Sequence, residues 1–481
     1  MTAESTDEEI RHSGYQPELN RTLGGLQLFA ISFAFISVLV AVFASYSIVL
    51  NYSGPAGIWL WIIVAIGQTL VALVVAQFAA RIALTGSSYQ WASRLANPKV
   101  GWFFGWLTFW FLAIGVVAMN NALASQALMP LLGIAPDEDV ARLITLALML
   151  TEAVLVIAST RLLGMVTSTT VGLELVILVA LIVGLGAVMV FSGTGTVDNL
   201  GSRGVAADAP NYFGIGGPLM ASMLMGLVTL VGFDSAANLA EEAKDPFRSV
   251  PRAIVSSVVA SAVLGFVFVL ILTLAIKDIG RVTASGSPVA TIIRDQIGPV
   301  MERVLLAGIV FAMFGAGMVM TAACSRQAFA MARDGRFPAH TLIRRVSPRT
   351  KTPIPATILI LVIGAVLMVA LPGAALLQLI VASTILPAVL YGGIVVLYLC
   401  VRKRLETKEG GFSLGRFELP VAYVALVWVA FAVFTLVSPS EARVPGLIVL
   451  GLMVVGGLYF AAMMLTNREV LETEPGEDEF S

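Results

Sequence analysis

The sequence predicts an all-α integral membrane protein with twelve transmembrane helices, and composition is the first observation behind this prediction. Of the 481 residues, 58% are hydrophobic and 12% are charged, whereas about 25% are charged in an average soluble domain. The mean hydropathy is +0.92. A soluble fold of this length cannot bury so much apolar surface. The composition therefore excludes a soluble enzyme and a disordered chain, and we expect no soluble catalytic domain.

The second observation is the spacing of the apolar segments. A helix needs about 20 apolar residues to cross a bilayer, and twelve segments meet this length approximately. They cover residues 26–50, 56–80, 101–129, 140–160, 168–191, 216–240, 252–276, 301–331, 354–371, 374–400, 419–438 and 445–466.

The third observation is the distribution of the basic residues. If both termini are cytoplasmic, 21 of the 29 Lys and Arg residues lie inside and seven lie outside, as the positive-inside rule requires. We therefore predict a multi-pass protein of the cell membrane with both termini in the cytoplasm. Its predicted parts are a tail (1–22), spans 1–5 (23–191), an extracellular loop (192–215), spans 6–10 (216–400), a cytoplasmic loop (401–418), spans 11 and 12 (419–466) and a second tail (467–481).

Charge and rare residue types exclude further classes. The 29 basic residues are balanced by 30 acidic ones, so no basic excess exists to hold a nucleic acid. The two cysteines, Cys324 and Cys400, belong to apolar segments, and the two histidines, His12 and His340, to polar ones. These residues form no metal-ligand motif, and no nucleotide-binding motif is present. We expect no metal, no cofactor and no enzymatic activity.

The sixth span carries polar residues where a transmembrane helix is normally apolar. Its centre contains Gly232, Asp234, Ser235 and Asn238. A charged side chain at the bilayer centre costs about 2.5–3.5 kcal/mol on insertion scales, so this segment must face protein or water. An interrupted helix there would expose backbone groups that a bound zwitterion can satisfy. The alternative is a polar kink that only fixes helix packing.

The first span is the expected partner of the sixth, because inverted repeats place matching breaks in corresponding helices. The run from Ser37 to Ala41 is the candidate break, although it contains a serine and no glycine. β-branched residues such as Val38 and Val40 weaken a helix only slightly.

Several motifs resemble a known family. The segment from Gly232 to Pro251 resembles the span 6–7 region of amino acid permeases in the amino acid–polyamine–organocation (APC) superfamily. The segment from Ser325 to Pro338 is similar to the end of span 8 in its amino acid/choline branch. Residues 85–91 and 51–55 resemble two of its turns.

This resemblance implies the leucine-transporter fold, with spans 1–5 and 6–10 as inverted repeats and two added helices. It also implies that broken spans 1 and 6 bind the substrate's amino and carboxylate groups through backbone atoms, with Phe233 closing over the substrate. Many relatives have Gly-x-Gly in span 1, whereas this chain has Val40-Ala41-Val42, which favours an amine or a larger substrate. The substrate-binding residues so implied are Ser37, Val38, Leu39, Val40, Ala41, Thr229, Val231, Gly232, Phe233 and Asp234.

Three further groups receive candidate roles. Asn120 of span 3 either lines the substrate path or makes a helix–helix hydrogen bond. Glu174 of span 5 and Arg326 of span 8 are predicted to pair, either as a proton relay that replaces a coupling ion or as a static ion pair. At the cytoplasmic mouth, we expect one of two roles for a group of four charged residues. They either form ion pairs that break in one gate state or act as simple interfacial anchors. These residues are Glu241, Glu242, Arg333 and Asp334.

The sequence thus predicts a secondary active transporter that moves an amino acid across the cell membrane by alternating access, coupled to protons. Its expected partners are a small-molecule substrate, the lipid bilayer and protons. The alternative is an exchanger or permease for an amine such as γ-aminobutyrate, choline, a polyamine or a cationic amino acid. A different class, a membrane sensor that binds a solute without moving it, also remains open.

Overall fold

The computed structural model describes residues 23–81, 87–158, 160–350, 352–371, 373, 375–405, 411–439 and 442–472, without the side chains of a few helix residues, Glu241 and Glu242 among them. Every regular element in these ranges is a helix. One parallel bridge joins Leu23 to Ala243, so the start of the first span lies beside the end of the sixth.

Eleven helices in the described part of the chain are long and apolar enough to cross a membrane. The first, second, third, sixth, ninth and tenth of these consist of consecutive segments. In chain order they are α2 (Gly25–Ile36) with α3 (Val38–Tyr52); η1 (Pro55–Trp59) with α4 (Leu60–Ala79); α6 (Pro98–Ala122) with η2 (Leu123–Leu128) and α7 (Met129–Leu132); α8 (Glu138–Ala158); α9 (Thr160–Ser192); α10 (Pro218–Ala221) with α11 (Met223–Thr229) and η5 (Phe233–Glu242); α12 (Pro246–Leu274); α15 (Pro299–Arg333); α18 (Ala375–Val401) with η6 (Arg402–Arg404); η7 (Gly415–Phe417) with α19 (Glu418–Val437); and α20 (Arg443–Thr466).

The ninth predicted span forms a shorter helix, α17 (Ile354–Ala370), of 17 residues. At a rise of 1.5 Å per residue it is about 25 Å long, against about 30 Å for the hydrocarbon core. The helix starts directly after Pro353, which limits its length at that end. The predicted count of twelve full-length spans therefore differs from the eleven that meet the length criterion.

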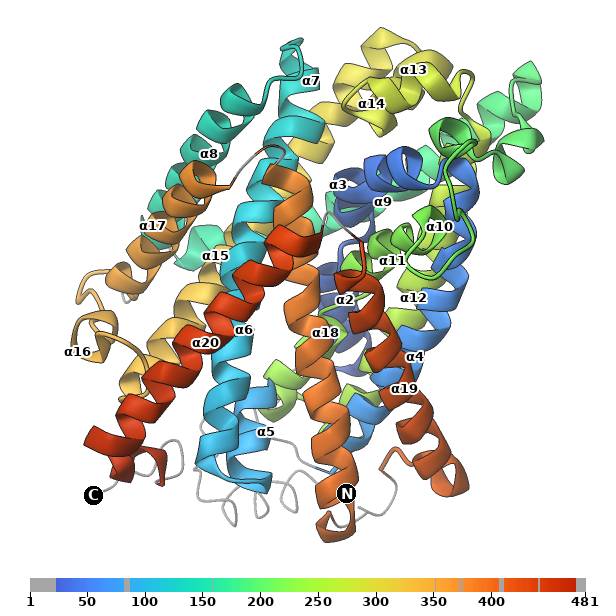
Figure 1. The fold of residues 1–481 in the computed structure, drawn as a ribbon. Coiled ribbons are helices and arrows are strands. Elements are labelled where there is room, and N and C mark those ends of the chain that lie inside the picture. The colour runs from blue at the N-terminus through green and yellow to red at the C-terminus, as the bar shows by residue number, and fades with distance from the viewer. Residues whose placement is uncertain are drawn as a thin grey trace.

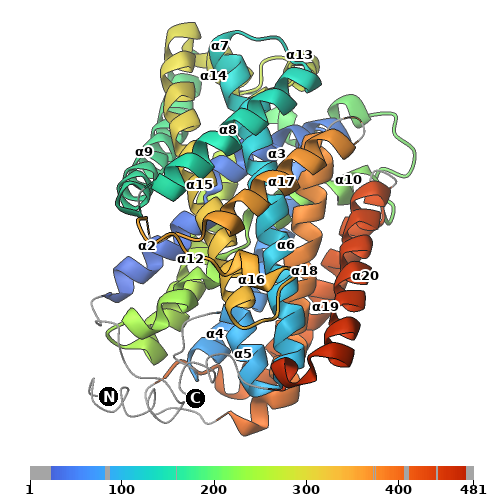
Figure 2. The same ribbon diagram turned by 90° about the vertical axis from the view of Figure 1, so that its left-hand side faces the viewer.

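The short helices mark the two ends of the molecule. Figures 1 and 2 show α7, α13 and α14 at one end, called the α13 end below, and α5 toward the opposite end, called the α5 end, with α16 in the same half of the molecule as α5. The short elements are α5 (Ser87–Leu95), η3 (Val197–Gly201), η4 (Gly204–Ala206), α13 (Ile279–Ala284), α14 (Pro288–Ile297), α16 (His340–Ile343) and η9 (Arg468–Leu471).

The outward faces of the long helices are apolar. On α9, Val176 and Val183 are exposed, and on α20 Leu447 and Leu458 are exposed. Such extended apolar surface is stable in lipid and not in water. The fold is therefore that of a multi-pass membrane protein.

Two elements are interrupted inside their apolar runs. The α2 helix ends at Ile36 and α3 begins at Val38, with Ser37 between them at φ 49°. The α11 helix ends at Thr229, and η5 begins at Phe233 after Gly232 at φ +77°. Glycine adopts this left-handed conformation without the steric cost that a Cβ brings. A Cβ at Gly232 would also overlap the Phe35 ring.

Helix packing brings the two interruptions together. The α2 helix packs on η5 and on α12, and α6 packs on α15 and α18. The α9 helix lies along α15. The interrupted segments pack on α12, α4 and α18, and α3 also contacts α6, α9 and α15, so these helices position the candidate site.

Candidate functional site

Ser37 connects the first interruption to the α9 helix. Its left-handed backbone turns the chain between α2 and α3, and its hydroxyl donates to Glu174 Oε1 at 2.9 Å. The first hydrogen bond inside α3 runs from the Ala41 N–H to the Ser37 carbonyl at 3.0 Å, so the first three N–H groups of α3 have no partner within the helix. The Leu39 N–H faces the Glu174 carboxylate. A carboxylate is thus held at the positive end of the α3 dipole.

The predicted residues that follow Ser37 lie in the first turn of α3. The side chains of Val38, Leu39 and Val40 are buried, and that of Ala41 is partly exposed. Val38, Leu39 and Val40 form part of the apolar core. What these residues offer a solute is therefore the backbone of the helix start.

Tyr391 holds the second interruption. Its hydroxyl accepts from the Gly232 N–H at 3.0 Å and donates to Asp234 Oδ1 at 2.9 Å. Its ring stacks on Phe233, with ring centroids 4.8 Å apart and an interplanar angle of 14°. One side chain of α18 thus fixes three consecutive residues of the interrupted segment.

Ser32 ties the two interrupted elements to each other. Its hydroxyl donates to the Phe233 carbonyl at 3.2 Å and accepts from the Ala236 N–H at 3.1 Å. These bonds connect two backbone polar groups of η5 to a side chain of α2. On the other side of the break, the Thr229 hydroxyl returns to the Met225 carbonyl at 2.7 Å, while the Val231 N–H reaches the Thr229 carbonyl at 3.0 Å.

A cavity of about 290 Å³ lies at the first interruption. We call it the Glu174 cavity, because Glu174 is the one charged residue in its described lining. The lining comes from α2, the Ser37 turn, α6, α9 and α15 and comprises Ala30, Ile31, Ala34, Phe35, Ser37, Met119, Thr170, Val171, Glu174, Ala312, Ala316, Val319 and Met320.

Asn120 lies deeper in the helix packing. It is fully buried, and its Nδ2 donates to Glu152 Oε2 at 2.9 Å and to the Val116 carbonyl at 3.1 Å. Thr321 of α15 donates to the same Glu152 oxygen at 3.2 Å. Asn120 thus links α6 to α8, which corresponds to the helix–helix alternative, and it does not line the Glu174 cavity.

The structure does not bring Arg326 to Glu174. The Arg326 side chain is exposed on α15, and the structure gives Glu174 no ion pair with it among the described residues. The predicted pairing therefore needs correction, because the side of α15 that carries Arg326 faces outward. The hydroxyl of Ser37 takes the place that the sequence suggested for the guanidinium.

The predicted gate residues lie at the α5 end. Asp334 Oδ2 accepts from the Tyr89 hydroxyl at 2.7 Å, and the Arg333 Nε lies 3.9 Å from Asp334 Oδ1. Arg336 also donates to the Tyr89 hydroxyl, at 2.9 Å. These contacts connect the end of α15 to α5. The side chains of Glu241 and Glu242 lie outside the described residues.

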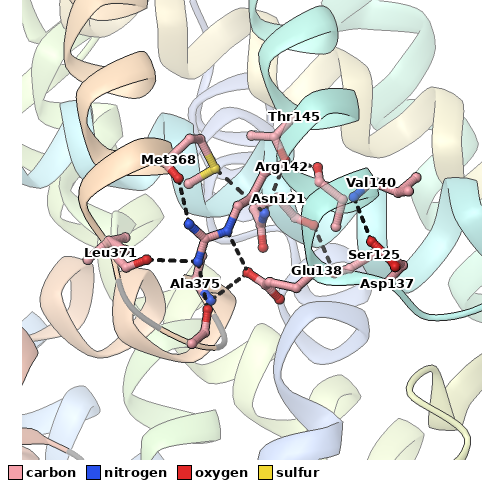
Figure 3. A network of polar contacts seen from close by, with 12 residues as sticks. Asn121, Ser125, Asp137, Glu138, Val140, Arg142, Thr145, Met368, Leu371 and Ala375 are labelled. Atoms are coloured by element: carbon pink, nitrogen blue, oxygen red, sulfur yellow. Dashed lines mark hydrogen bonds and ion pairs between the residues drawn. The ribbon is translucent and has the colours of Figure 1, made fainter.

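A second, more polar cavity of about 500 Å³ lies toward the α13 end. Beside it, Arg142 of α8 donates to the carbonyls of Met368, Leu371 and Gly373 at 2.6–2.8 Å. Glu138 accepts from Arg142 at 3.2 Å and from the Ala375 N–H at 2.9 Å. Figure 3 shows the guanidinium directed at the turn between α17 and α18. This network, the Arg142 clamp, fixes that turn to α8.

Sequence reasoning missed Tyr391, Ser32 and Phe35. Tyr391 is an isolated hydroxyl four residues after Pro387 in an apolar helix, and polar groups in such runs usually need a partner. That pattern could have marked it as a contact residue. Ser32 and Phe35 carry no such signal, because serine and phenylalanine are common in transmembrane helices.

Comparison with known proteins identifies the family. The family model described as "Amino acid permease" matches residues 23–465. The amino-acid permease BAT1 homolog of Oryza sativa subsp. japonica is 27% identical over 468 residues, with 88% of this chain and 85% of the relative covered.

Two other relatives are named for different solutes. The thiamine transporter thi9 of Schizosaccharomyces pombe is 24% identical, covering 93% of this chain and 82% of the relative. The GABA-specific permease of Saccharomyces cerevisiae is 27% identical, covering 71% of this chain and 62% of the relative. The family match spans nearly the whole chain, as the resemblance of its motifs predicted, and the chain belongs to the amino acid permease family of the APC superfamily as a multi-pass membrane permease.

Proposed function

We propose that the protein is a secondary active permease that moves an amino acid across the plasma membrane by alternating access, coupled to protons. The observation that carries the proposal is the pair of interrupted elements joined through Ser32, with a carboxylate beside each break. Discontinuous helices in transporters present backbone N–H and carbonyl groups to a polar solute near the bilayer midplane. Interrupted backbone is tolerated there only where it faces protein or a cavity.

In the proposed architecture α17 also crosses the membrane as the ninth span in chain order, which brings the number of spans to twelve. Its 17 apolar residues are at the short end of the range for a transmembrane helix, and local thinning of the bilayer accommodates such a length. The α2–α3 and α10–α11–η5 elements then start two repeats of five spans each, with α19 and α20 added. Both termini lie in the cytoplasm, with the α5 end facing inward.

In the proposed site the solute contacts the backbone at the two breaks. These groups belong to Ser37–Ala41 and to Thr229 and Val231–Asp234, and Phe233 and Tyr391 shape the second break. Support comes from the left-handed residues Ser37 and Gly232, which leave backbone groups outside the helical pattern.

We assign proton coupling to Glu174. It is the charged residue of the cavity beside the first break, and its hydrogen bond to Ser37 links its protonation state to the α2–α3 connection. Protonation removes the charge that faces the N-terminus of α3 and so weakens this link. At the α5 end, the contacts among Arg333, Asp334 and Tyr89 are proposed to form in one gate state and to break in the other.

A permease for an amine is the second candidate, because the described lining of the Glu174 cavity carries an acidic residue and no basic one. Two relatives are named for γ-aminobutyrate and thiamine, so this family contains members named for solutes beyond the standard amino acids.

Uptake by purified protein in proteoliposomes tests the proposed function. Labelled amino acids and amines that do not cross lipid unaided are offered with and without an inward proton gradient. Uptake of an amino acid that increases with the gradient supports proton-coupled transport. Uptake only into vesicles preloaded with amino acid would point to exchange, and uptake of no solute by folded protein would contradict the transporter function.

A further inference from the structure

The Glu174 cavity combines one carboxylate with apolar walls. Its lining contains four alanines, two methionines, two valines, one isoleucine and one phenylalanine, and its polar members besides Glu174 are Ser37 and Thr170. Small alanine side chains on α2 and α15 leave the space open. Such a cavity offers burial to an apolar group and a single site for charge.

Among the residues that the structure describes, no cationic side chain forms an ion pair with Glu174. Oε1 accepts from Ser37 at 2.9 Å, and the Leu39 N–H faces the carboxylate. An ionised carboxylate can accept about four hydrogen bonds, so acceptor capacity remains toward the cavity. A carboxylate away from bulk water is stable only if it is paired with a cation or protonated. No Lys, Arg or His is present in the described lining.

We infer that the Glu174 cavity is a binding site for a primary ammonium ion with an apolar body, and that the bound ammonium takes the place of a proton on Glu174. This inference rests on the second candidate function, a permease for an amine, and names the substrate class of that site. The nitrogen donates to Glu174, as in other charge-assisted hydrogen bonds. The apolar body packs against the alanine, valine and methionine walls.

The exchange conserves charge. The protonated Glu174 carboxyl group loses its proton to solution as the ammonium ion R–NH₃⁺ enters, and the carboxylate–ammonium pair remains. Only the O–H bond of the carboxyl group breaks, and the ammonium keeps its three protons. One proton is released for each amine bound, so an amine and a proton travel in opposite directions when one site carries both.

Phe35 connects the occupant to the second interruption. Its ring lines the cavity and lies so close to the Gly232 Cα that a Cβ there would overlap it. An aromatic face attracts a cation within about 6 Å of the ring centroid. A bound ammonium therefore lies between Glu174 and the aromatic residue that packs on the α11–η5 break.

A zwitterionic amino acid fits this cavity less well than its decarboxylated amine. Its carboxylate would enter a lining with no cation among the described residues and would lie near the charge of Glu174. The N-terminus of α3, the favourable position for an anion, already faces Glu174. Removing the solute's carboxylate should therefore increase affinity.

The pH dependence of binding is assigned to Glu174, since titratable and charged groups on the packed helices have other partners or positions. On α3, Tyr46 bonds to Thr273 of α12, and on η5, Asp234 accepts from Tyr391 of α18. On α8, Glu152 bonds to Asn120 and Thr321, and Glu138 pairs with Arg142. Arg294 of α14 pairs with Glu302 of α15, Arg281 of α13 pairs with Asp295 of α14, and Arg303 and Arg326 of α15 are exposed. On α12, Arg248 and Arg252 lie in the first turns.

The test uses full-length protein in detergent, because the neutral form of a small amine crosses lipid bilayers unaided. The probes are isoamylamine, leucine and isoamyl alcohol, which share one branched body and differ in charged groups. Thermal stabilisation measures binding, because a ligand that binds only the folded state stabilises it. A pH indicator in weak buffer measures proton release, with sodium chloride as the inorganic cation control.

The inference expects isoamylamine to bind at least tenfold more tightly than leucine, and the alcohol not to bind measurably. At a pH below the pKa of Glu174, where the free carboxyl group is protonated, it also expects one proton released per amine bound. Below the pKa of Glu174, the apparent dissociation constant should rise about tenfold per pH unit, because proton and amine compete for one carboxylate.

Variants identify the carboxylate. Glu174→Gln should abolish amine binding and proton release, whereas Glu174→Asp, which keeps the charge on a shorter side chain, should retain both with weaker affinity. Glu302→Gln removes a carboxylate of α15 that lies outside the cavity lining and should bind like the parent protein. If Glu174→Gln does not fold, the Glu174→Asp result and the proton count still decide.

Four outcomes overturn the inference: leucine binding as tightly as isoamylamine, amine binding without proton release at every pH tested, proton release by sodium alone, or full binding by folded Glu174→Gln. If the amine does not bind while proteoliposomes still accumulate leucine, this inference falls and the permease function stands. If the amine binds with proton release and no solute is transported, the site stands and the transport function falls.

Discussion

Tyr391 fixes the second interruption through a single hydroxyl. That oxygen accepts from the Gly232 N–H and donates to Asp234, at the point where the 3-10 helix η5 begins. A buried donor or acceptor that loses its partner costs about 1–3 kcal/mol. The stacking of Tyr391 on Phe233 does not depend on the hydroxyl, so the two contributions can be separated.

Tyr391→Phe should keep the stacked rings and leave the Gly232 N–H unpaired. We expect a loss of about 1–3 kcal/mol of unfolding free energy, measured by denaturant unfolding in detergent. Tyr423→Phe is the control, because Tyr423 is 57% exposed on the outer face of α19. The unfolding free energy of the Tyr423→Phe protein should equal that of the parent protein. Equal stability of Tyr391→Phe and the parent protein would contradict the assigned role of this hydroxyl.

Among the elements, the α11–η5 interruption depends on the conformation of Gly232. A residue with a Cβ pays about 1–2 kcal/mol in the left-handed region, and here the added Cβ would also meet the Phe35 ring. Gly232→Ala should therefore reduce thermal stability and uptake together. Gly184→Ala in α9 is the control, since no atom lies within 4 Å of its added Cβ and alanine favours a helix. The assignment fails if both variants behave alike.

The Arg142 clamp determines how firmly the start of α18 is attached to α8. A planar guanidinium reaches three carbonyls at once, which the compact ammonium of lysine cannot do. Arg142→Lys should speed amide hydrogen exchange in residues 375–386 about tenfold or more, because a local loss of about 1.4 kcal/mol is a tenfold change in opening. The effect should stop near Pro387, which lies inside α18.

The control for the clamp is Arg281→Lys. Arg281 is 57% exposed in its pair with Asp295, and exposed pairs contribute little to stability. Its exchange pattern in α18 should match that of the parent protein. Unchanged exchange in Arg142→Lys would mean that the clamp does not restrain this helix.

For the whole molecule, the proposed topology requires α17 to cross the membrane despite its 17 residues. Arg349, before α17, and Leu376, after it in the lining of the polar cavity, should then lie on opposite sides. In a protein with Cys324 and Cys400 replaced, a membrane-impermeant thiol reagent should label Leu376→Cys in intact cells. Arg349→Cys should react only after permeabilisation. Labelling of both from one side would exclude the twelve-span arrangement.

The prediction of a membrane permease from sequence depended on features that are local in the chain. Apolar runs and the positions of basic residues determine which segments enter lipid, and the motifs around Gly232–Asp234 and Ser325–Pro338 carry the family resemblance. Eleven of the predicted spans appear as long apolar helices, and the family match confirms the permease class. The roles of the predicted site residues stay predictions, with Ser37 and Gly232 at the left-handed turns.

The sequence by itself thus determined the class, the approximate spans and the residues where a helix is weakened, because each depends on neighbours within a few helical turns. Only the tertiary structure decided which groups meet there. Ser37 bonds Glu174 across 137 positions, and Tyr391 bonds Gly232 across 159. Arg326 was expected to pair with Glu174 because the two residues lie at a similar depth in their predicted spans, but its side chain is exposed. Depth in the membrane follows from residue number, whereas the direction in which a helix turns each side chain follows from its packing against the other helices.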